Sequence, residues 1–412
     1  MKILMLGWEL PPYNSGGLGV ACYKLCKALA AYGVEIDFAV PYAAVHDNID
    51  FMRVIPALPY SIEELRTFAG AYESGSFTTT VFAQPSAHSA HLPRTLREQQ
   101  ARFTEAVQGI AAKGNYDMIH AHDWLTYEAA IAAKKELAVP VIAHVHATEF
   151  DRSGEHHGNP LVHEIEQQGL NLADHVVAVS QLTKDIIVRE YGLPADKVTV
   201  VHNAIDPQDF EPVSSANAYA YLAHMKAKGY KVVLSTNRFT VQKGMTYFLR
   251  AARDALSKNP KLLFLLCGSG EQYHELIELS TSLGIAENVI FSGFVRGKAL
   301  RDAYEMADMF VMSSVSEPFG ISALEAVGYG NVTLVSKQSG ICEVVKNILT
   351  FDYWDVPKLA NYIVATAEHE SLRTTLKANA RDEFQHFSWH TVAEKCQRLY
   401  DEQNYLAKVG VV

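Results

Sequence analysis

Two carboxylates and a run of hydroxyls flank a turn in the last third of the chain. The stretch 313–325 reads SSVSEPFGISALE and carries Glu317 and Glu325 eight positions apart. The apolar run 309–312 before it predicts a buried strand, and residues 321–327 predict a helix. Ligands of parallel α/β sheets bind where strands end, helix N-termini attract anions, and carboxylates accept hydrogen bonds from sugar hydroxyls. The stretch therefore indicates a site for a sugar joined to a phosphate, such as a nucleotide sugar.

Cations for such a phosphate follow another predicted strand. Arg238 and Lys243 come directly after the apolar segment 232–237, although the chain as a whole carries a net charge of −10. An arginine can fork two phosphate oxygens and a lysine adds a point charge, each attraction being about 4 kcal/mol at 4 Å before desolvation. The turn 337–340 offers a second cradle for a diphosphate, with a helix expected from near Ile341. The acidic balance makes a duplex nucleic acid an improbable partner.

A glycine-rich loop follows the first predicted strand, residues 3–8. Gly16 and Gly17 precede a helix expected over 20–32, and glycines let a backbone approach a phosphate closely. The spacing is not the dinucleotide fingerprint, so the loop alone indicates a tight turn as readily as a binding site.

Polar side chains also end two further predicted strands. Asp123 closes the strand 118–124, and His146 closes the strand 139–146, in which His144 and His146 share a face. Two histidines with no third ligand apparent do not make a metal site, so we expect no metal. Glu149 and Arg152 follow in a loop that either closes over a substrate or is a plain surface loop.

The remaining pattern is that of an alternating α/β chain in two parts. A length of 412 residues predicts two domains, and 49% hydrophobic with 20% charged residues is typical of a globular protein. Further strands are expected at 34–40, 51–55, 77–84, 176–179, 198–201, 262–267, 289–292 and 332–336. Further helices are expected at 94–113, 298–307, 356–368, 371–384 and 391–405.

Cysteine usage and hydropathy indicate the compartment. The five cysteines are odd in number and scattered, which favours reduced thiols and a cytoplasmic protein. The apolar start is too short for a signal peptide, and no 18-residue apolar segment exists. Peripheral membrane association and oligomeric state stay open.

The sequence 317–320, Glu-Pro-Phe-Gly, followed by Leu324 and Glu325 resembles the paired-glutamate motif of retaining glycosyltransferases with the GT-B fold, most closely the family-four group that includes glycogen-synthase-like enzymes. The resemblance covers nearly the whole chain. It implies an α/β fold of two facing, doubly wound Rossmann-like domains whose last helix crosses back onto the first. The expected bounds are 1–205 for the acceptor-side domain, 206–230 for a linker, 231–385 for the nucleotide-sugar domain and 386–412 for the last helix.

The same resemblance implies a role for each candidate residue. His146, Glu317, Arg238 and Lys243 would be catalytic; Gly16, Gly17, Arg238, Lys243, Phe319, Gly320, Ile321 and Glu325 would bind the donor; and Asp123, Glu149 and Arg152 are candidates for the acceptor side or a loop. No cofactor is required, because the nucleotide diphosphate sugar is itself a substrate. The expected reaction moves a hexosyl group, glucose from UDP- or ADP-glucose, to a carbohydrate in the manner of glycogen or starch synthases.

Several alternatives stay open. The chain has Asn14-Ser15 where the longer ADP-glucose-dependent bacterial enzymes have Lys-Thr, and residues 50–90, the expected acceptor surface, match nothing that names an acceptor. A sucrose-, trehalose- or glycolipid-forming glycosyltransferase, a nucleotide-sugar epimerase of the same architecture and a non-catalytic sugar-nucleotide sensor are the competing hypotheses. A phosphorylase is disfavoured by the short length and by the lack of an identifiable pyridoxal lysine.

Overall fold

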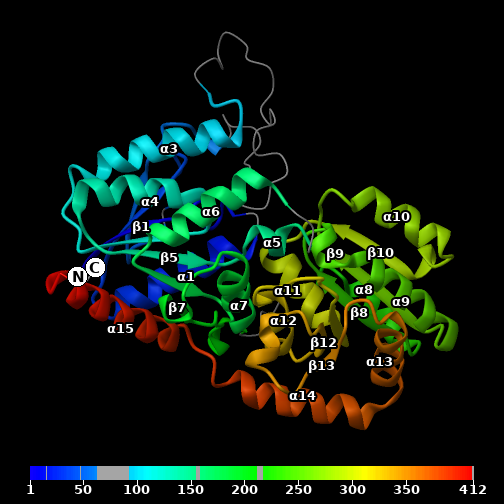
Figure 1. Cartoon of the computed structure of the whole chain (residues 1–412). Coiled ribbons are helices and arrows are strands. Elements are labelled where there is room, and N and C mark those ends of the chain that lie inside the picture. Colours follow the sequence, from blue (N-terminus) through cyan, green and yellow to red (C-terminus); the bar gives the residue numbers. More distant parts are fainter. Residues whose placement is uncertain (15, 47, 63–91, 155–157, 211–216, 411–412) are drawn as a thin grey trace. The chain divides into compact units, whose positions relative to one another are not determined.

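The computed structural model describes residues 1–410 except 15, 47, 63–91, 155–157 and 211–216. They fall into two compact units (Figure 1), one of Met1–Asn203 with Trp389–Val412 and one of Ala204–Ser388. The described part of the predicted linker, 206–230, lies in the second unit and includes helix α8 (Ala220–Ala227), which packs against α11 (Gly297–Met306) and the first strand of that unit.

The first unit is built on a sheet whose described strands are all parallel, in the order β3-β2-β1-β4-β5-β6-β7. The strand order reverses between β1 and β4, and such a switch point is where open α/β sheets bind ligands. The strands are β1 (Lys2–Leu6), β2 (Glu35–Val40), β3 (Arg53–Pro56), β4 (Met118–His122), β5 (Val141–Val145), β6 (His175–Ala178) and β7 (Val198–Val200).

Helices lie on both faces of this sheet. Figure 1 shows α3, α4 and α6 on one side and α1 with α15 on the other, and α15 packs along α1 as expected for the last helix. The Nδ1 atom of His120 in β4 lies 2.6 Å from the hydroxyl of Tyr400 in α15, which ties this helix to the sheet. The helices are α1 (Gly17–Ala31), α3 (Leu96–Ala111), α4 (Trp124–Leu137), α5 (Glu149–Arg152), α6 (Pro160–Leu172), α7 (Gln181–Glu190) and α15 (Trp389–Lys408), with a 3-10 turn at Ala195–Lys197.

The second unit repeats the plan with a parallel sheet in the order β10-β9-β8-β11-β12-β13. Its switch point lies between β8 and β11. The strands are β8 (Lys231–Thr236), β9 (Leu262–Cys267), β10 (Val289–Gly293), β11 (Met309–Met312), β12 (Val332–Ser336) and β13 (Leu349–Phe351). The helices besides α8 and α11 are α9 (Met245–Lys258), α10 (Tyr273–Ser282), α12 (Ile321–Gly328), α13 (Val356–Glu368) and α14 (Glu370–Phe384), with 3-10 turns at Pro207–Phe210, Val241–Lys243, Ala286–Asn288 and Gly340–Glu343.

The core of the second unit follows from this alternation. Strand β9, with the sequence LLFLLC, is buried at every position, as a strand covered by helices on both faces must be. Phe248 of α9 packs edge-to-face on Phe264 of β9, and Leu359 and Ile363 of α13 lie in the same cluster of buried side chains.

One prediction for this unit was wrong, and one strand was missed. The helix expected from Ile341 is only a 3-10 turn, Gly340–Glu343, which has too few aligned peptides for a helix dipole. Strand β13 was not predicted, because three residues at a sheet edge give no periodic signal. The strand expected at 77–84 lies outside the described residues.

Candidate functional site

The loop that follows β11 holds Glu317 against a lysine. The ammonium of Lys243 lies 2.8 Å from Glu317 Oε2, with the two side chains 15% and 13% exposed. The hydroxyl of Ser314 donates to the same oxygen over 3.2 Å. The backbone is also fixed, because Glu317 N donates to the Gln338 carbonyl and Gly340 N donates to the Glu317 carbonyl. The predicted turn 337–340 thus lies beside the glutamate motif and holds it.

Lys243 is positioned by a turn that only glycine can complete. Gly244 follows it at φ +60°, and a Cβ there would lie 2.2 Å from the carbonyl oxygen of Ser313. The Ser313 hydroxyl in turn donates to the carbonyls of Lys243 and Gly244. Arg238 lies just beyond β8 and is partly buried. The carboxyl ends of β8 and β11 therefore bring the predicted cations and the first glutamate to one edge of the sheet.

The second glutamate of the motif is held by a buried tyrosine. Tyr304 of α11 donates its hydroxyl to Glu325 Oε2 over 2.9 Å, and the hydroxyl of Thr236 lies 2.9 Å from the same phenol oxygen. Burial of the carboxyl raises the pKa of Glu325 to about 7, and the Tyr304 hydrogen bond opposes this shift. Glu325 therefore titrates close to neutral pH.

The start of α12 has the features expected of a ligand loop. Phe319 is buried, Gly320 caps the helix at φ +104°, and Ile321 is the first helical residue. A Cβ at position 320 would come within 2.8 Å of the Met312 side chain, so the sharp turn requires glycine.

In the first unit, Asp123 holds the backbone of His146. Asp123 lies at the end of β4 with a φ of +60°, and its Oδ1 accepts hydrogen bonds from the backbone N–H of His146 (2.7 Å) and of Ala147 (3.4 Å). Burial raises the pKa of the Asp123 carboxyl to about 7. The side chain of Asp123 thus holds the backbone of the loop after β5. We conclude that this residue supports His146 structurally.

Four histidine rings form a row along the ends of β4 and β5. The rings of His144 and His146 stack with centroids 4.3 Å apart, as their predicted common face requires. His122 Nδ1 lies 2.9 Å from His146 Nε2, and His120 Nε2 lies 3.2 Å from His144 Nδ1. Burial lowers the pKa of His146 to about 3 and holds the pKa values of the other three well below the ordinary range. The imidazoles are therefore neutral at pH 7.

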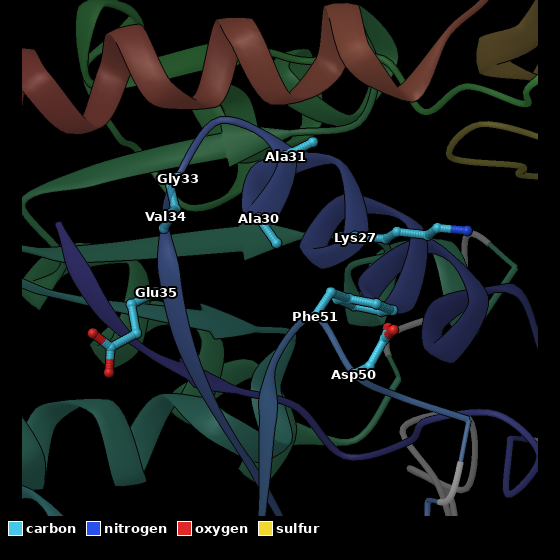
Figure 2. A pocket seen from close by; sticks show the side chains of 8 residues that line it. All are labelled: Lys27, Ala30, Ala31, Gly33, Val34, Glu35, Asp50 and Phe51. Carbon is cyan, nitrogen blue, oxygen red and sulfur yellow. The ribbon is translucent and has the colours of Figure 1, made fainter.

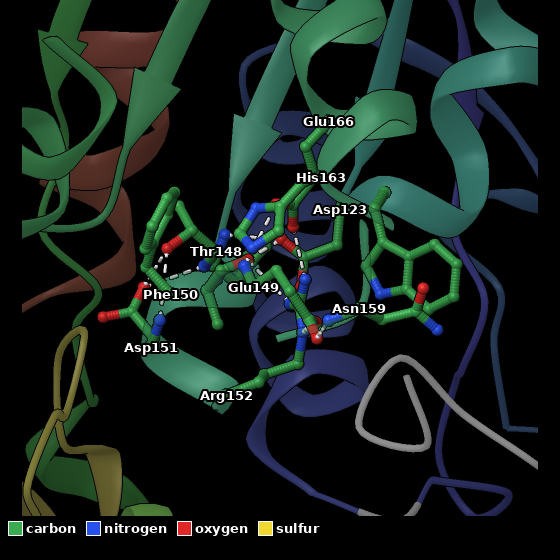
Figure 3. Close-up of polar contacts among 12 residues, drawn as sticks. Asp123, Thr148, Glu149, Phe150, Asp151, Arg152, Asn159, His163 and Glu166 are labelled. Atoms are coloured by element: carbon green, nitrogen blue, oxygen red, sulfur yellow. Dashed lines mark hydrogen bonds and ion pairs between the residues drawn. The ribbon is translucent and has the colours of Figure 1, made fainter. Parts of the chain in front are cut away.

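The predicted loop of Glu149 and Arg152 is instead the short helix α5, tied down by buried ion pairs (Figure 3). The Arg152 guanidinium donates to Glu149 Oε2 over 3.0 Å and to Glu166 Oε1, and its Nη1 donates to the Ala147 carbonyl over 2.8 Å. A capping box between Thr148 and Asp151 starts the helix. Because the charges are buried and paired, this segment differs from the loop that we expected.

The predicted glycine loop begins helix α1. Gly17 is its first residue, and Gly16 is the preceding cap, with its carbonyl accepting a hydrogen bond from the Asn14 side-chain amide over 2.9 Å. Helix α1 follows β1 and so starts at the same sheet edge as Asp123 and His146. Gly19 is closely packed, because a Cβ there would lie 2.8 Å from Asn14 Cβ.

A surface hollow of about 500 Å³ lies in the first unit at the opposite sheet edge (Figure 2). It is lined by Lys27, Ala30, Ala31, Gly33, Val34, Glu35, Asp50 and Phe51. These residues surround the end of α1 and the starts of β2 and β3. Ligands of parallel sheets bind at strand carboxyl ends, so this hollow is not the candidate site.

Sequence reasoning missed the residues that support the predicted ones. Tyr304, His122 and Glu166 each come from a different element than the residue they contact. The signal for His122 was present in the run His-Ala-His-Asp at 120–123, where alternation puts two imidazoles on one face of β4. Nothing in the sequence pattern marks Tyr304, whose role depends on how α11 packs.

Two parallel, doubly wound units with ligand-type loops at strand carboxyl ends define the class: this is the GT-B fold. The chain aligns over 97% of its length with sucrose-phosphate synthase from Thermosynechococcus elongatus (TM-score 0.76, 21% identity, 98% of that chain). It aligns over 98% with the Anabaena protein HepE in complex with UDP-glucose (TM-score 0.71, 20% identity, 100% of that chain).

The sequence comparisons identify the family. Residues 15–209 match the model of glycosyltransferase family 4, and residues 223–383 match that of glycosyl transferases group 1. An uncharacterized glycosyltransferase of Methanocaldococcus jannaschii is 30% identical over 97% of this chain and 98% of its own length. A glycogen synthase of Mycobacterium tuberculosis is 27% identical over 97% of this chain and 94% of its own length. The chain belongs to the family-four glycosyltransferases, and the predicted resemblance to the glycogen-synthase-like group is confirmed.

None of the described helices combines the length and apolar character needed to cross a membrane.

Proposed function

We propose that this glycosyltransferase moves a hexosyl group, glucose, from UDP- or ADP-glucose to a carbohydrate acceptor with retention of the anomeric configuration. The observation that carries the proposal is the arrangement after β8 and β11, where Lys243 pairs with Glu317 and Glu325 lies in the helix that follows. The glycogen synthase relative and the UDP-glucose bound to HepE support a glucosyl donor.

Cleavage of the bond between the anomeric carbon and the diphosphate builds negative charge on the leaving group. Arg238 and Lys243 would stabilise that charge, together with backbone N–H groups at Gly16 and Gly17, since fixed charges and dipoles are effective where water is excluded. No metal ion is required for this stabilisation. Lys243 is now paired with Glu317, so it would exchange a carboxylate for a phosphate when the donor binds.

The glutamates would recognise the two sugars of the donor. Glu325 would accept hydrogen bonds from the ribose hydroxyls, and the N–H groups near Phe319, Gly320 and Ile321 would contact the donor. Glu317 would orient the hydroxyls of the transferred sugar. His146, neutral and partly exposed, would polarise groups beside the reacting carbon.

A donor screen tests the proposal. Purified enzyme is incubated with UDP-, ADP- and GDP-sugars, with and without a panel of glucans, free sugars, sugar phosphates and lipid-linked sugars, and release of the nucleotide is measured. We expect release from UDP- or ADP-glucose that depends on an acceptor and falls at least about 100-fold in Glu317→Gln. The absence of any acceptor-dependent release would contradict the proposal.

The products separate the alternatives. Proton NMR of the new glycosidic linkage is expected to show the donor's anomeric configuration, and an inverted anomer would overturn the retaining assignment. Donor isomerisation without an acceptor would identify an epimerase, and donor binding without turnover would identify a sensor. A sucrose-, trehalose- or glycolipid-forming activity would appear as turnover with the corresponding acceptor alone.

A further inference from the structure

A thiol and two imidazoles from three separate elements converge in the first unit. Cys22 of α1, His122 at the end of β4 and His146 just after β5 each place one ligand atom within 4.8 Å of the others. The two histidines show no third ligand in the sequence around them, because the thiol belongs to a helix about a hundred residues away. We propose that Cys22, His122 and His146 form a binding site for a soft divalent cation, Zn²⁺, with one coordination position left open.

The donor set fits zinc. Thiolate sulfur and imidazole nitrogen are its preferred ligands, and a site with three protein ligands keeps the fourth position for water or another molecule. In a tetrahedral site the ligand atoms lie roughly 3.3–3.8 Å apart. His122 Nδ1 and His146 Nε2 are already 2.9 Å apart and the three ligand atoms lie within 4.8 Å of one another, so small movements of the side chains would bring them to these separations.

The surroundings of the site favour a cation. Both rings are neutral, as metal ligation requires, because burial lowers their pKa values. Burial is the main cause of the raised pKa of the Cys22 thiol, and the carboxyls of Asp123 and Glu9 add to that shift; in their ionised form these carboxyls would also attract a dication. On binding, the Cys22 thiol releases its proton to solvent and the thiolate offsets half of the zinc charge.

Neighbouring contacts orient the ligands. His122 Nε2 lies 3.1 Å from the Met5 sulfur, which leaves Nδ1 directed toward His146. The second nitrogen of a zinc-bound histidine usually donates to an oxygen acceptor, and the Met5 sulfur takes that position here. His146 is partly exposed, whereas Cys22 and His122 are buried, so an ion would reach the site past His146.

A second group of histidines does not carry the same inference. His120, His122 and His144 also converge, but all three are buried. This group has no thiolate to offset the charge of a metal ion.

The consequence for activity rests on the proposed function. Zinc on His146 would withdraw the imidazole that we propose acts beside the reacting sugar, so micromolar zinc would inhibit turnover. Binding itself does not depend on that role, and the two are tested separately.

The binding experiment uses the whole chain freed of metal with a chelator. Zinc is titrated in competition with a chromophoric chelator, and Co²⁺ is used as a spectroscopic substitute that reports thiolate ligation by a charge-transfer band. We expect one zinc per chain and a thiolate–cobalt band in the wild type. Cys22→Ser should abolish the band and weaken zinc binding at least about 100-fold, since losing even an outer-shell partner costs 10–100-fold.

Cys26→Ser is the matched control. Cys26 lies one turn further along the same helix, is equally buried, and is not among the converging ligands, so this variant should retain the band and bind zinc within about twofold of the wild type. Retention of the band in Cys22→Ser, or its absence from the wild type, would overturn the proposal.

X-ray absorption of the zinc-loaded wild type does not depend on any variant folding. One sulfur at about 2.3 Å and two imidazole nitrogens at about 2.0 Å are expected. A shell of oxygen ligands only would show adventitious surface binding and would contradict the site. Zinc binding without inhibition would leave the site intact and count against the catalytic role of His146.

Discussion

Lys243 and Glu317, 74 residues apart in the sequence, form an ion pair with the lysine nitrogen 2.8 Å from Glu317 Oε2. Each belongs to a separate βα loop at the switch point of the second sheet. The pair keeps a mobile cation and a carboxylate aligned before any donor arrives. If the cation transfers to a phosphate as we propose, the pair would link donor binding to the release of Glu317 for hydrogen bonding to a sugar.

Removing this cation is expected to weaken binding of a nucleoside diphosphate. Lys243→Ala should lower the affinity for UDP or ADP by about 10-fold or more, because a hydrogen bond to a charged group contributes about 1.5–3 kcal/mol. Isothermal titration calorimetry measures the change. Lys258→Ala is the control, since that lysine is exposed, contacts only the Asn361 amide oxygen among the described residues, and should leave the affinity unchanged. Equal affinities of wild type and Lys243→Ala would exclude the phosphate role.

The raised pKa of Glu325 leads us to expect that nucleotide affinity depends on pH. Its pKa of about 7, raised by burial, means that the carboxyl loses its proton as pH rises through neutrality. Only the ionised form offers all its oxygens as acceptors to ribose hydroxyls, so affinity should increase between about pH 6 and pH 8. The ligand's phosphate also titrates, and Glu325→Gln provides the comparison that isolates the protein group. A pH dependence that persists unchanged in Glu325→Gln would assign the effect to the ligand.

Tyr304 lowers the pKa of the Glu325 carboxyl. Its hydroxyl donates to Glu325 Oε2 and so stabilises the charged form. Tyr304→Phe should raise the Glu325 pKa further and move the pH dependence of nucleotide affinity toward alkaline values, while the phenylalanine keeps the ring packing. A uniform loss of affinity with no movement of the pH midpoint would indicate a purely structural role.

The alternation of strands and helices was predictable because buried parallel strands have an unmistakable composition. The strands at 262–267, 309–312 and 332–336 and the helix at 356–368 have the bounds expected from their apolar runs. Candidate residues were found for the same reason, since polar side chains directly after such strands must lie at one sheet edge.

The sequence did not show which polar side chains of different helices and strands contact one another. The Tyr304 hydroxyl reaches Glu325 only because α11 and α12 lie on neighbouring connections, and Cys22 meets His146 only because α1 begins at the sheet edge where β5 ends. Glu149 and Arg152 were expected in a loop, either closing over the substrate or plainly on the surface, because the pairing of Arg152 with Glu166 depends on the packing of α6. Periodicity reports which face of an element is buried, and not which polar groups meet there.

The histidine row predicts a loss of stability in acid. In the unfolded chain each histidine binds a proton below about pH 6.5, whereas the buried rings of His120, His122, His144 and His146 stay neutral. Stability is therefore retained above pH 6.5 and falls as pH drops below it, by about 1.4 kcal/mol per pH unit for each net proton bound on unfolding.

Two buried acids of the same unit change the free energy of unfolding with pH in the opposite direction. Asp123 and Glu166 have raised pKa values, so the folded state holds their protons at pH values where the unfolded chain has released them. With four histidines against two acids, the net effect is still a loss of stability in acid. Urea unfolding of the metal-free protein, followed by tryptophan fluorescence, measures it, and His144→Gln should reduce the slope with pH. A free energy of unfolding that is constant between about pH 7 and pH 5 would contradict this prediction.

The ion pairs of Arg152 predict a structural role that can be separated from one in catalysis. Arg152 is 4% exposed and lies between Glu149 and Glu166, each 3% exposed. Burial alone would lower the pKa of this guanidinium, but the two carboxylates raise it above its ordinary value, so the arginine remains charged. Arg152→Met keeps most of the side-chain volume and leaves two carboxylates buried without their cation. Breaking a buried pair in this way costs about 3–5 kcal/mol, and urea unfolding should show a loss of that size.

Arg189→Ala, which removes an exposed pair with Glu190, should change stability by less than about 1 kcal/mol. If Arg152→Met is as stable as the wild type yet loses turnover with every acceptor, the arginine belongs to the reaction and not to the framework.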